Sequence, residues 1–275
     1  MNLLLRLFLL LTIGTSTLVA QSNEGQWDSY IAEYENGFPG STTVRMDLIK
    51  KAPISHLPFV LVTGLVYETS RADGFPENET FEVLHKVGDQ LIPLIADETE
   101  SILVGSFMHN GERLEYFYIK DQDGIKEKIE KFYTKNYPNH KFYLNIKDDR
   151  GWQYYREFLY PNEDILNYMS DEKVIMNLEK AGDNLSKPRR VDHWLYFSSE
   201  PEMNRCREEL INLDFSVEYA GKKPGNPLGF ELHIWRVDKV DISSIFPVTS
   251  ELRKIAEKHK GEYDGWETSV EKEQK

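Results

Sequence analysis

The residues best suited to chemistry lie near the end of the chain, where two carboxylates flank a tryptophan. Asp264 and Glu267 stand on either side of Trp266 in the run 261–270. A large aromatic side chain with polar contact residues around it is typical of the centre of a protein–protein interface. We therefore predict Asp264, Trp266 and Glu267 as candidate partner-binding residues.

The same run also fits an ordinary strand, and this alternative stays open. In it, Trp266 packs into a core while both carboxylates face solvent. Side chains alternate along a strand, so Asp264 and Trp266 are expected on one face and Glu267 on the other. Gly265 is expected to allow a bulge or a close backbone approach.

A second group of carboxylates suggests hydrolysis as an alternative function, because glycosidases use two carboxylates. Its members are Glu112, Glu115, Asp121 and Asp123. Their spacing is that of a hairpin followed by a turn, which favours ordinary solvated charges. The sequence therefore predicts no catalytic residue.

The histidines and the cysteine predict neither a metal site nor a cofactor. His193 and His233 lie in strands that are expected to be neighbours, but the chain has no HxH or HExxH spacing. Cys206 is the single cysteine, so no intramolecular disulfide can form. Its place in a helical pattern predicts a buried thiol.

The charge of the chain limits its partners. Its net charge is −13. A chain this acidic repels phosphate backbones, which disfavours direct binding of nucleic acid. The same charge suits a basic protein surface or cations.

Residues 1–20 have the pattern of a secretory signal peptide. Arg6 gives a positive start, residues 7–13 form an apolar core, and small residues lead to Ala20, after which cleavage is expected. The alternative is an uncleaved anchor, although the run is short for a membrane-spanning helix of about 20 residues. We predict an exported protein, periplasmic or secreted, with no stable membrane span after the leader is removed.

Hydrophobic periodicity predicts two similar sets of elements. From residue 58 the expected order is strand, helix, strand, hairpin, strand, helix and strand, and a hairpin precedes it. The same order recurs from residue 191, and helices are expected over 152–160 and 163–180 between the two sets. The chain is therefore predicted to be α+β, with two ferredoxin-like (βαββαβ) α/β-sandwich domains in tandem, joined by a helical segment.

Two families share stretches with this chain. Residues 27–161 resemble the domain of unknown function 695, through runs that include 58–64 (PFVLVTG) and 110–116 (NGERLEY). Residues 190–270 are similar to the type-B regulators of ribonuclease E, through VDHWLYF at 191–197 and YDGWET at 263–268. The tandem arrangement with an export signal resembles chains of Bacteroidetes-type bacteria.

The resemblances imply binding rather than a reaction. The first implies a fold unit with no established activity. The second implies a small acidic ferredoxin-like domain, from a family that inhibits an RNA-degrading enzyme by binding it.

The predicted organisation is a signal peptide over 1–20, a first domain over 27–161, a helical linker over 162–189 and a regulator-like domain over 190–270. We predict a non-enzymatic protein-binding or regulatory module. The alternatives are a hydrolase of unknown substrate that uses convergent carboxylates and a structural envelope-associated protein.

Overall fold

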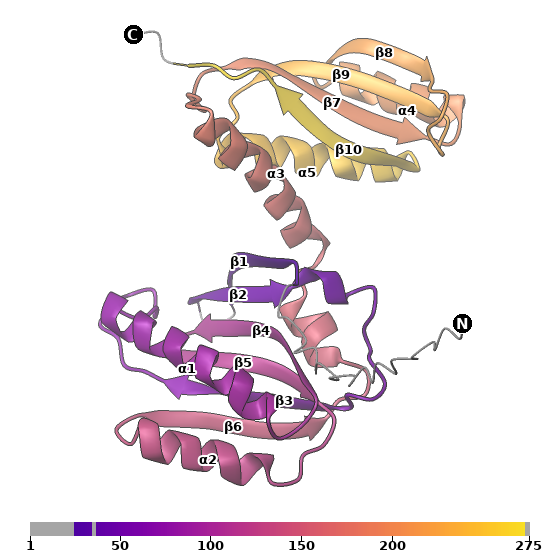
Figure 1. The fold of residues 1–275 in the computed structure, drawn as a ribbon. Coiled ribbons are helices and arrows are strands. Elements are labelled where there is room, and N and C mark those ends of the chain that lie inside the picture. The colour runs from indigo at the N-terminus through magenta and orange to yellow at the C-terminus, as the bar shows by residue number, and fades with distance from the viewer. Residues whose placement is uncertain (1–24, 35–36, 273–275) are drawn as a thin grey trace, which may run out of the picture. The chain divides into compact units, whose positions relative to one another are not determined.

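The computed structural model describes residues 25–34 and 37–272. The predicted signal peptide therefore lies outside the described residues. The chain divides into two compact units, one ending at Tyr160 and the other beginning at Pro161. Each unit has its own antiparallel sheet (Figure 1), which confirms the α+β class.

The first unit is built on a six-stranded sheet. Its strand order is β1-β2-β4-β5-β3-β6, with every neighbouring pair antiparallel. The strands are β1 (Trp27–Glu33), β2 (Pro39–Arg45), β3 (Phe59–Val66), β4 (Ser101–His109), β5 (Glu112–Ile119) and β6 (Lys141–Asp148). Asn110 and Gly111 form the tight turn between β4 and β5 with positive φ angles, as their sequence predicts.

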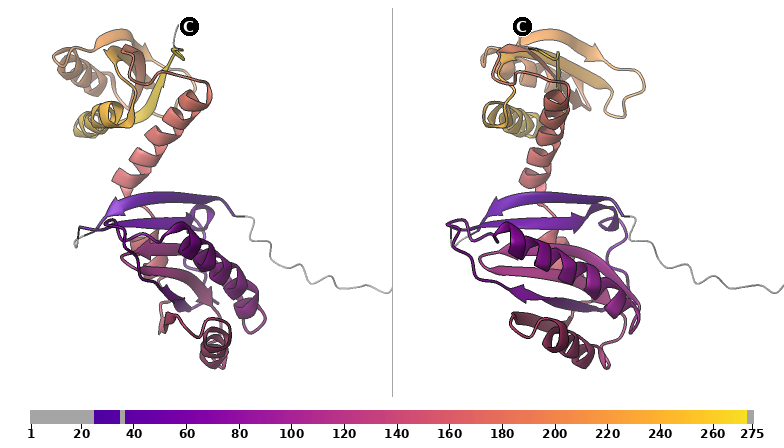
Figure 2. Two further views of the ribbon diagram at one scale, coloured as in Figure 1. Left: turned by 90° about the vertical axis from the view of Figure 1, so that its left-hand side faces the viewer. Right: turned by 60° about the vertical axis from the view of Figure 1, so that its left-hand side comes forward.

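Two helices, α1 (Asn78–Ala96) and α2 (Ile125–Asn136), cover one face of this sheet (Figure 2). They bury one stripe each against alternate residues of β3 and β5, and these side chains form one core. A run of apolar residues at helical spacing gives α1 its buried stripe: Leu84, Val87, Leu91 and Ile95.

The opposite face of the sheet is covered by a short segment after β6. The segment expected as a helix over 152–160 is a π-helical turn, η2 (Tyr154–Leu159). Trp152 stacks on Tyr118 with ring centroids 4.0 Å apart, and its indole donates to the carbonyl of Leu57. A separate 3₁₀ turn, η1 (Met46–Leu48), follows β2.

The second unit has a four-stranded antiparallel sheet in the order β10-β7-β9-β8. Its elements are α3 (Glu163–Lys180), β7 (Arg189–Phe197), α4 (Glu200–Ile211), β8 (Ser216–Lys222), β9 (Phe230–Asp238), α5 (Ile242–Lys258) and β10 (Gly261–Thr268). Alternate residues of β7 are buried, and Leu195 and Phe197 pack against α4 and α5 in one core. The period-2 pattern of β7 therefore gives the sheet a helix-covered face and an open face.

Helix α3 packs within the second unit, although the sequence predicts it as part of a linker over 162–189. Asn162 caps its first turn by accepting from the amide of Ile165 at 2.9 Å. Ile175 and Leu178 join a small core with Trp266.

The residues after α3 are also fixed to the second unit. The guanidinium of Arg189 makes two hydrogen bonds to the carboxylate of Asp183, at 2.5 and 2.8 Å, and both side chains are buried. Among the helices of the described residues, none is long and apolar enough to cross a membrane.

Candidate functional site

The three predicted binding residues lie on β10, where a bulge changes their directions. Tyr263 pairs with Leu195, but Gly265 pairs with Trp194, so Asp264 is an extra residue in the strand. Gly265 has a φ of 156°, which favours glycine. The prediction that Asp264 and Trp266 lie on the same face of the strand is therefore wrong, although the expected bulge is present.

Trp266 is turned toward the helix-covered face and is 8% exposed. Its indole nitrogen donates to Oδ1 of Asp171 on α3 at 3.0 Å. The tryptophan therefore packs in the core, which is the alternative that the sequence leaves open, and only the two carboxylates are exposed.

Asp171 is the residue that sequence reasoning missed. It is 1% exposed and also accepts hydrogen bonds from the Thr249 hydroxyl at 2.5 Å and from the Arg253 guanidinium at 3.2 Å. A buried carboxylate needs such partners, and removing one of them leaves an uncompensated group. One signal in the sequence could have found it: Asp171 occurs at helical spacing with the apolar residues Ile175 and Leu178, on the buried side of α3.

A second buried polar group lies beside this network. His193 is fully buried, and its Nδ1 lies 2.9 Å from the Tyr263 hydroxyl. Burial, together with the charge of Arg236, lowers the pKa of His193 to about 3, so the ring is neutral at physiological pH. His193 thus belongs to the core, and the described residues contain no group of three or more side chains suited to a metal ion.

Asp264 and Glu267 line a shallow depression of about 450 Å³ at the middle of β10. Trp194 and Tyr196 of the open sheet face contribute to it, and so does one side of Trp266. Neither carboxylate forms an ion pair with another described residue. The structure therefore brings the three predicted residues to one depression, with the two carboxylates accessible to solvent.

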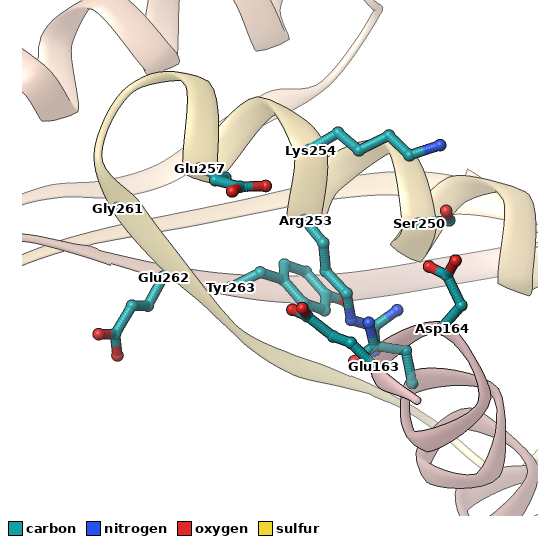
Figure 3. Close-up of a pocket in the computed structure, with 10 residues that line it drawn as sticks. Glu163, Asp164, Ser250, Arg253, Lys254, Glu257, Gly261, Glu262 and Tyr263 are labelled. Carbon is teal, nitrogen blue, oxygen red and sulfur yellow. The ribbon is translucent and has the colours of Figure 1, made fainter. Parts of the chain in front are cut away.

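A second depression, of about 500 Å³, lies at the start of β10 (Figure 3). Its acidic residues come from three elements: Glu163 and Asp164 of α3, Glu257 of α5 and Glu262 of β10. Its basic residues are Arg253, which lies over the ring of Tyr263 at 5.0 Å from the centroid, and Lys254. Carboxylates thus outnumber basic groups in this depression as well.

The open sheet face beside these depressions is already paired internally. Arg190 lies over the ring of Trp235 and bonds to Asp192 at 2.6 Å, and His233 also bonds to Asp192, at 2.7 Å. Burial of Asp192 raises its pKa, but the hydrogen bonds from Arg190 and His233 outweigh that effect and lower it. The unpaired negative charge therefore lies along β10 rather than at the centre of the sheet.

Neither an imidazole nor a thiol accompanies the acidic edge. Among the residues that line the two depressions there is neither a histidine nor a cysteine. Cys206 is fully buried, as its helical pattern predicts, and burial raises its pKa to about 12. What this arrangement can do chemically is attract and hold positive charge.

The carboxylates proposed for hydrolysis do not gather. Glu112 begins β5, while Asp121 and Asp123 follow the end of that strand, and all three are exposed. Glu115 alone is buried. The structure therefore does not assemble this set into a catalytic pair.

Comparison with known proteins assigns both units to families. Residues 25–160 match the family of unknown function DUF695, and residues 169–268 match the family called regulator of ribonuclease activity B. The second match begins two residues before Asp171 and ends two residues after Trp266, so it includes both ends of the buried network.

Two curated relatives share a weaker likeness. They are the aspartyl/glutamyl-tRNA(Asn/Gln) amidotransferase subunits B of Borrelia duttonii (strain Ly) and Borrelia recurrentis (strain A1), each 22% identical over 153 residues. The likeness covers 52% of this chain but 31% of each relative, so it carries no activity to this chain.

The two family matches fall on the two compact units of the chain. The chain joins a member of the family of unknown function DUF695, at residues 25–160, to a member of the regulator of ribonuclease activity B family, at residues 169–268.

Proposed function

We propose that the protein is an exported, non-enzymatic regulator whose second unit binds a basic segment of a partner protein along β10. The observation that carries this proposal is the pair of exposed carboxylates, Asp264 and Glu267, beside a depression that includes Trp194 and Tyr196. Exposed carboxylates beside aromatic rings can pair with Lys or Arg, and a basic side chain gains further from lying on a ring.

The charge of the whole chain supports the same choice of partner. The net charge of −13 divides almost evenly between the two units. A field of this sign speeds the encounter with a basic surface and repels nucleic-acid phosphates. We therefore propose a protein partner, with no direct contact to nucleic acid.

The family of the second unit supports regulation by binding. The family of this unit is that of the regulator of ribonuclease activity B. We infer that what this unit keeps from its family is the binding role, and that an exported chain uses it on a different partner. Export, to the periplasm or the medium, rests on the pattern of residues 1–20.

We further infer that both units are ferredoxin-like. In the second unit the chain runs β7-α4-β8-β9-α5-β10, which is βαββαβ, with the sheet order β10-β7-β9-β8. In the first unit β3-α1-β4-β5-α2-β6 repeats that order, and its sheet order β6-β3-β5-β4 corresponds strand for strand.

The test is capture of a partner from envelope fractions by the leaderless protein, at low and at high salt. Asp264→Ala combined with Glu267→Ala should reduce capture of a basic protein severalfold, and added salt should reduce capture by the wild type in the same way. Glu179→Ala combined with Glu208→Ala is the matched control, because it removes equal charge from exposed helical positions outside both depressions. Equal capture by the wild type and both double variants would contradict the proposal.

A further inference from the structure

A hollow of about 250 Å³ lies in the first unit, beside α1. His85, Gly88 and Asp89 of α1 form one side of it, and Arg113 and Glu115 of β5 contribute charged groups. Strands β1 and β2 extend the sheet past β4, and Trp27 and Thr43 from these strands also line the hollow. The added hairpin thus completes a site that neither family match explains.

Glu115 is a buried charge in this hollow. It is 4% exposed, and its Oε1 accepts from Nε of Arg113 at 2.9 Å. Burial raises the pKa of Glu115, the attraction of Arg113 opposes this without cancelling it, and the charge of Asp89 raises it further. Arg113 therefore offsets only part of the cost of burying this carboxylate.

His85 does not supply that charge. Its Nε2 lies 2.8 Å from Nη1 of Arg113, and because arginine only donates, the histidine nitrogen must accept. A ring that accepts there is neutral, and burial together with Arg113 lowers the pKa of His85. Asp89 has no ion-pair partner among the described residues, so Arg113 balances one of the two carboxylates and a single negative charge remains.

Gly88 leaves space on α1 for the carboxylate of Glu115. A Cβ at residue 88 would lie 2.9 Å from Oε1 of Glu115. Glycine in a helix interior is less favourable than alanine, yet α1 has it at a buried position beside the carboxylate. The glycine therefore makes room for the charged side chain of Glu115, at a position where alanine would give a more stable helix.

We propose that this hollow binds one monocationic group, an alkylammonium or a guanidinium, with Asp89 and Glu115 as its carboxylate partners. Its volume is below that of pockets for drug-sized ligands, so the site fits the end of a single basic chain. Thr43 and Ser106 add hydroxyl groups for further hydrogen bonds, and Trp27 and Ile92 add apolar surface for the methylene stem. The cation can come from a small free amine or from a lysine or arginine side chain of a polypeptide.

The test is an NMR titration of the leaderless full-length chain with capped lysine, N-acetyl-lysine methylamide. Capped norleucine, which has nearly the same shape without the charge, is the matched probe. We expect saturable shifts of the amides of His85, Gly88 and Glu115 with the lysine probe alone. Binding should also lower the pKa of Glu115, so the affinity should fall as the pH is lowered through that pKa.

Variants distinguish binding in the hollow from a general attraction between the probe and an acidic protein. Asp89→Asn should weaken the lysine probe severalfold, because the amide keeps an acceptor oxygen but removes the negative charge that pairs with the ammonium. Glu112→Gln is the matched control on β5: it removes an exposed carboxylate outside the hollow and should leave the affinity unchanged. Glu115→Gln should weaken binding as well, and if that variant does not fold, Asp89→Asn still decides.

The outcomes that overturn the proposal are also clear. Equal shifts with lysine and norleucine, no saturable shift with lysine, or an unchanged affinity in Asp89→Asn would each contradict it. A pentapeptide with a central lysine distinguishes the sources of the cation. Tighter binding than capped lysine supports a polypeptide ligand, and equal binding supports a small amine.

Discussion

The two units use one order of strands and helices but place their buried charges differently. In the first unit one buried carboxylate, Glu115, belongs to the shared sheet, and the β1–β2 hairpin that borders it is an addition. In the second unit one buried carboxylate, Asp171, belongs to the added helix α3 and is satisfied by the shared elements. The comparison teaches that each polar site forms where an added element meets the common unit, and that both contribute to it.

The difference has consequences for stability. Asp171 accepts from three donors, so its charge is well compensated and fixes α3 to the sheet. Glu115 has Arg113 as its donor and keeps a raised pKa. One charge therefore holds a fold together, while the other is suited to an additional partner.

The largest effect is expected from Trp266→Ala. Truncating a buried aromatic side chain typically destabilises a protein by about 3–5 kcal/mol, and here a hydrogen bond to Asp171 is lost as well. Urea unfolding followed by circular dichroism measures the change in the transition of the second unit. Trp194→Ala, on the open face of the same sheet, is the control and should destabilise less. Wild-type stability in Trp266→Ala would mean that the indole lies at an interface instead.

Asp171→Ala should come next, at about 3 kcal/mol, since it leaves Arg253 and the Trp266 indole without their acceptor. The same unfolding measurement tests it. Glu172→Ala, the exposed neighbour on α3, should be close to neutral. If the two variants unfold alike, α3 is not held by its buried carboxylate.

The pH dependence of stability should have opposite signs in the two units. Burial of Asp183 raises its pKa, but hydrogen bonds from Arg189 and the Glu271 amide outweigh this and lower it below the unfolded value. Its contribution is then complete above the unfolded pKa and is lost as the pH falls through the folded pKa. The stability difference between the wild type and Asp183→Asn should therefore shrink at acid pH, and a constant difference would contradict this.

Glu115 should behave in the reverse way. Because its folded pKa is raised, the folded state holds its proton more tightly, so stability falls as the pH rises from the unfolded to the folded pKa. Glu115→Gln should thus gain stability relative to the wild type as the pH rises through that window. Glu112→Gln should show no such trend, and urea unfolding at several pH values compares the two.

The smallest effect is expected from Asp264→Ala combined with Glu267→Ala. Both side chains are exposed on β10, and such substitutions usually change stability by no more than about 0.5 kcal/mol each. Thermal melting tests this directly. A large loss of stability would show that these carboxylates support the strand, and it would remove the basis for reading them as binding groups.

Local patterns allowed much of the fold to be predicted. The helix expected over 163–180 is α3, and the strand expected over 191–197 is the main part of β7. These elements follow from apolar spacing within a short window, which a single sequence displays. The family resemblances of both halves were also confirmed.

Long-range pairings could not be predicted in the same way. Asp171 and Trp266 are 95 residues apart, and no periodicity connects them. The segment before β7 has the composition of a linker, yet the ion pair between Asp183 and Arg189 fixes it. The bulge at Asp264 shifts the alternation by one residue, which reverses the faces expected from a regular strand.

The most direct test of the central claim is photo-cross-linking from the depression beside β10. A photo-reactive benzoylphenylalanine replaces Tyr196, an aromatic residue of the same depression, in one protein and Glu208, an exposed residue of α4, in the other. The account predicts a discrete adduct with a basic protein from position 196 and none from position 208. No adduct from position 196, or the same adducts from both positions, would contradict binding along β10.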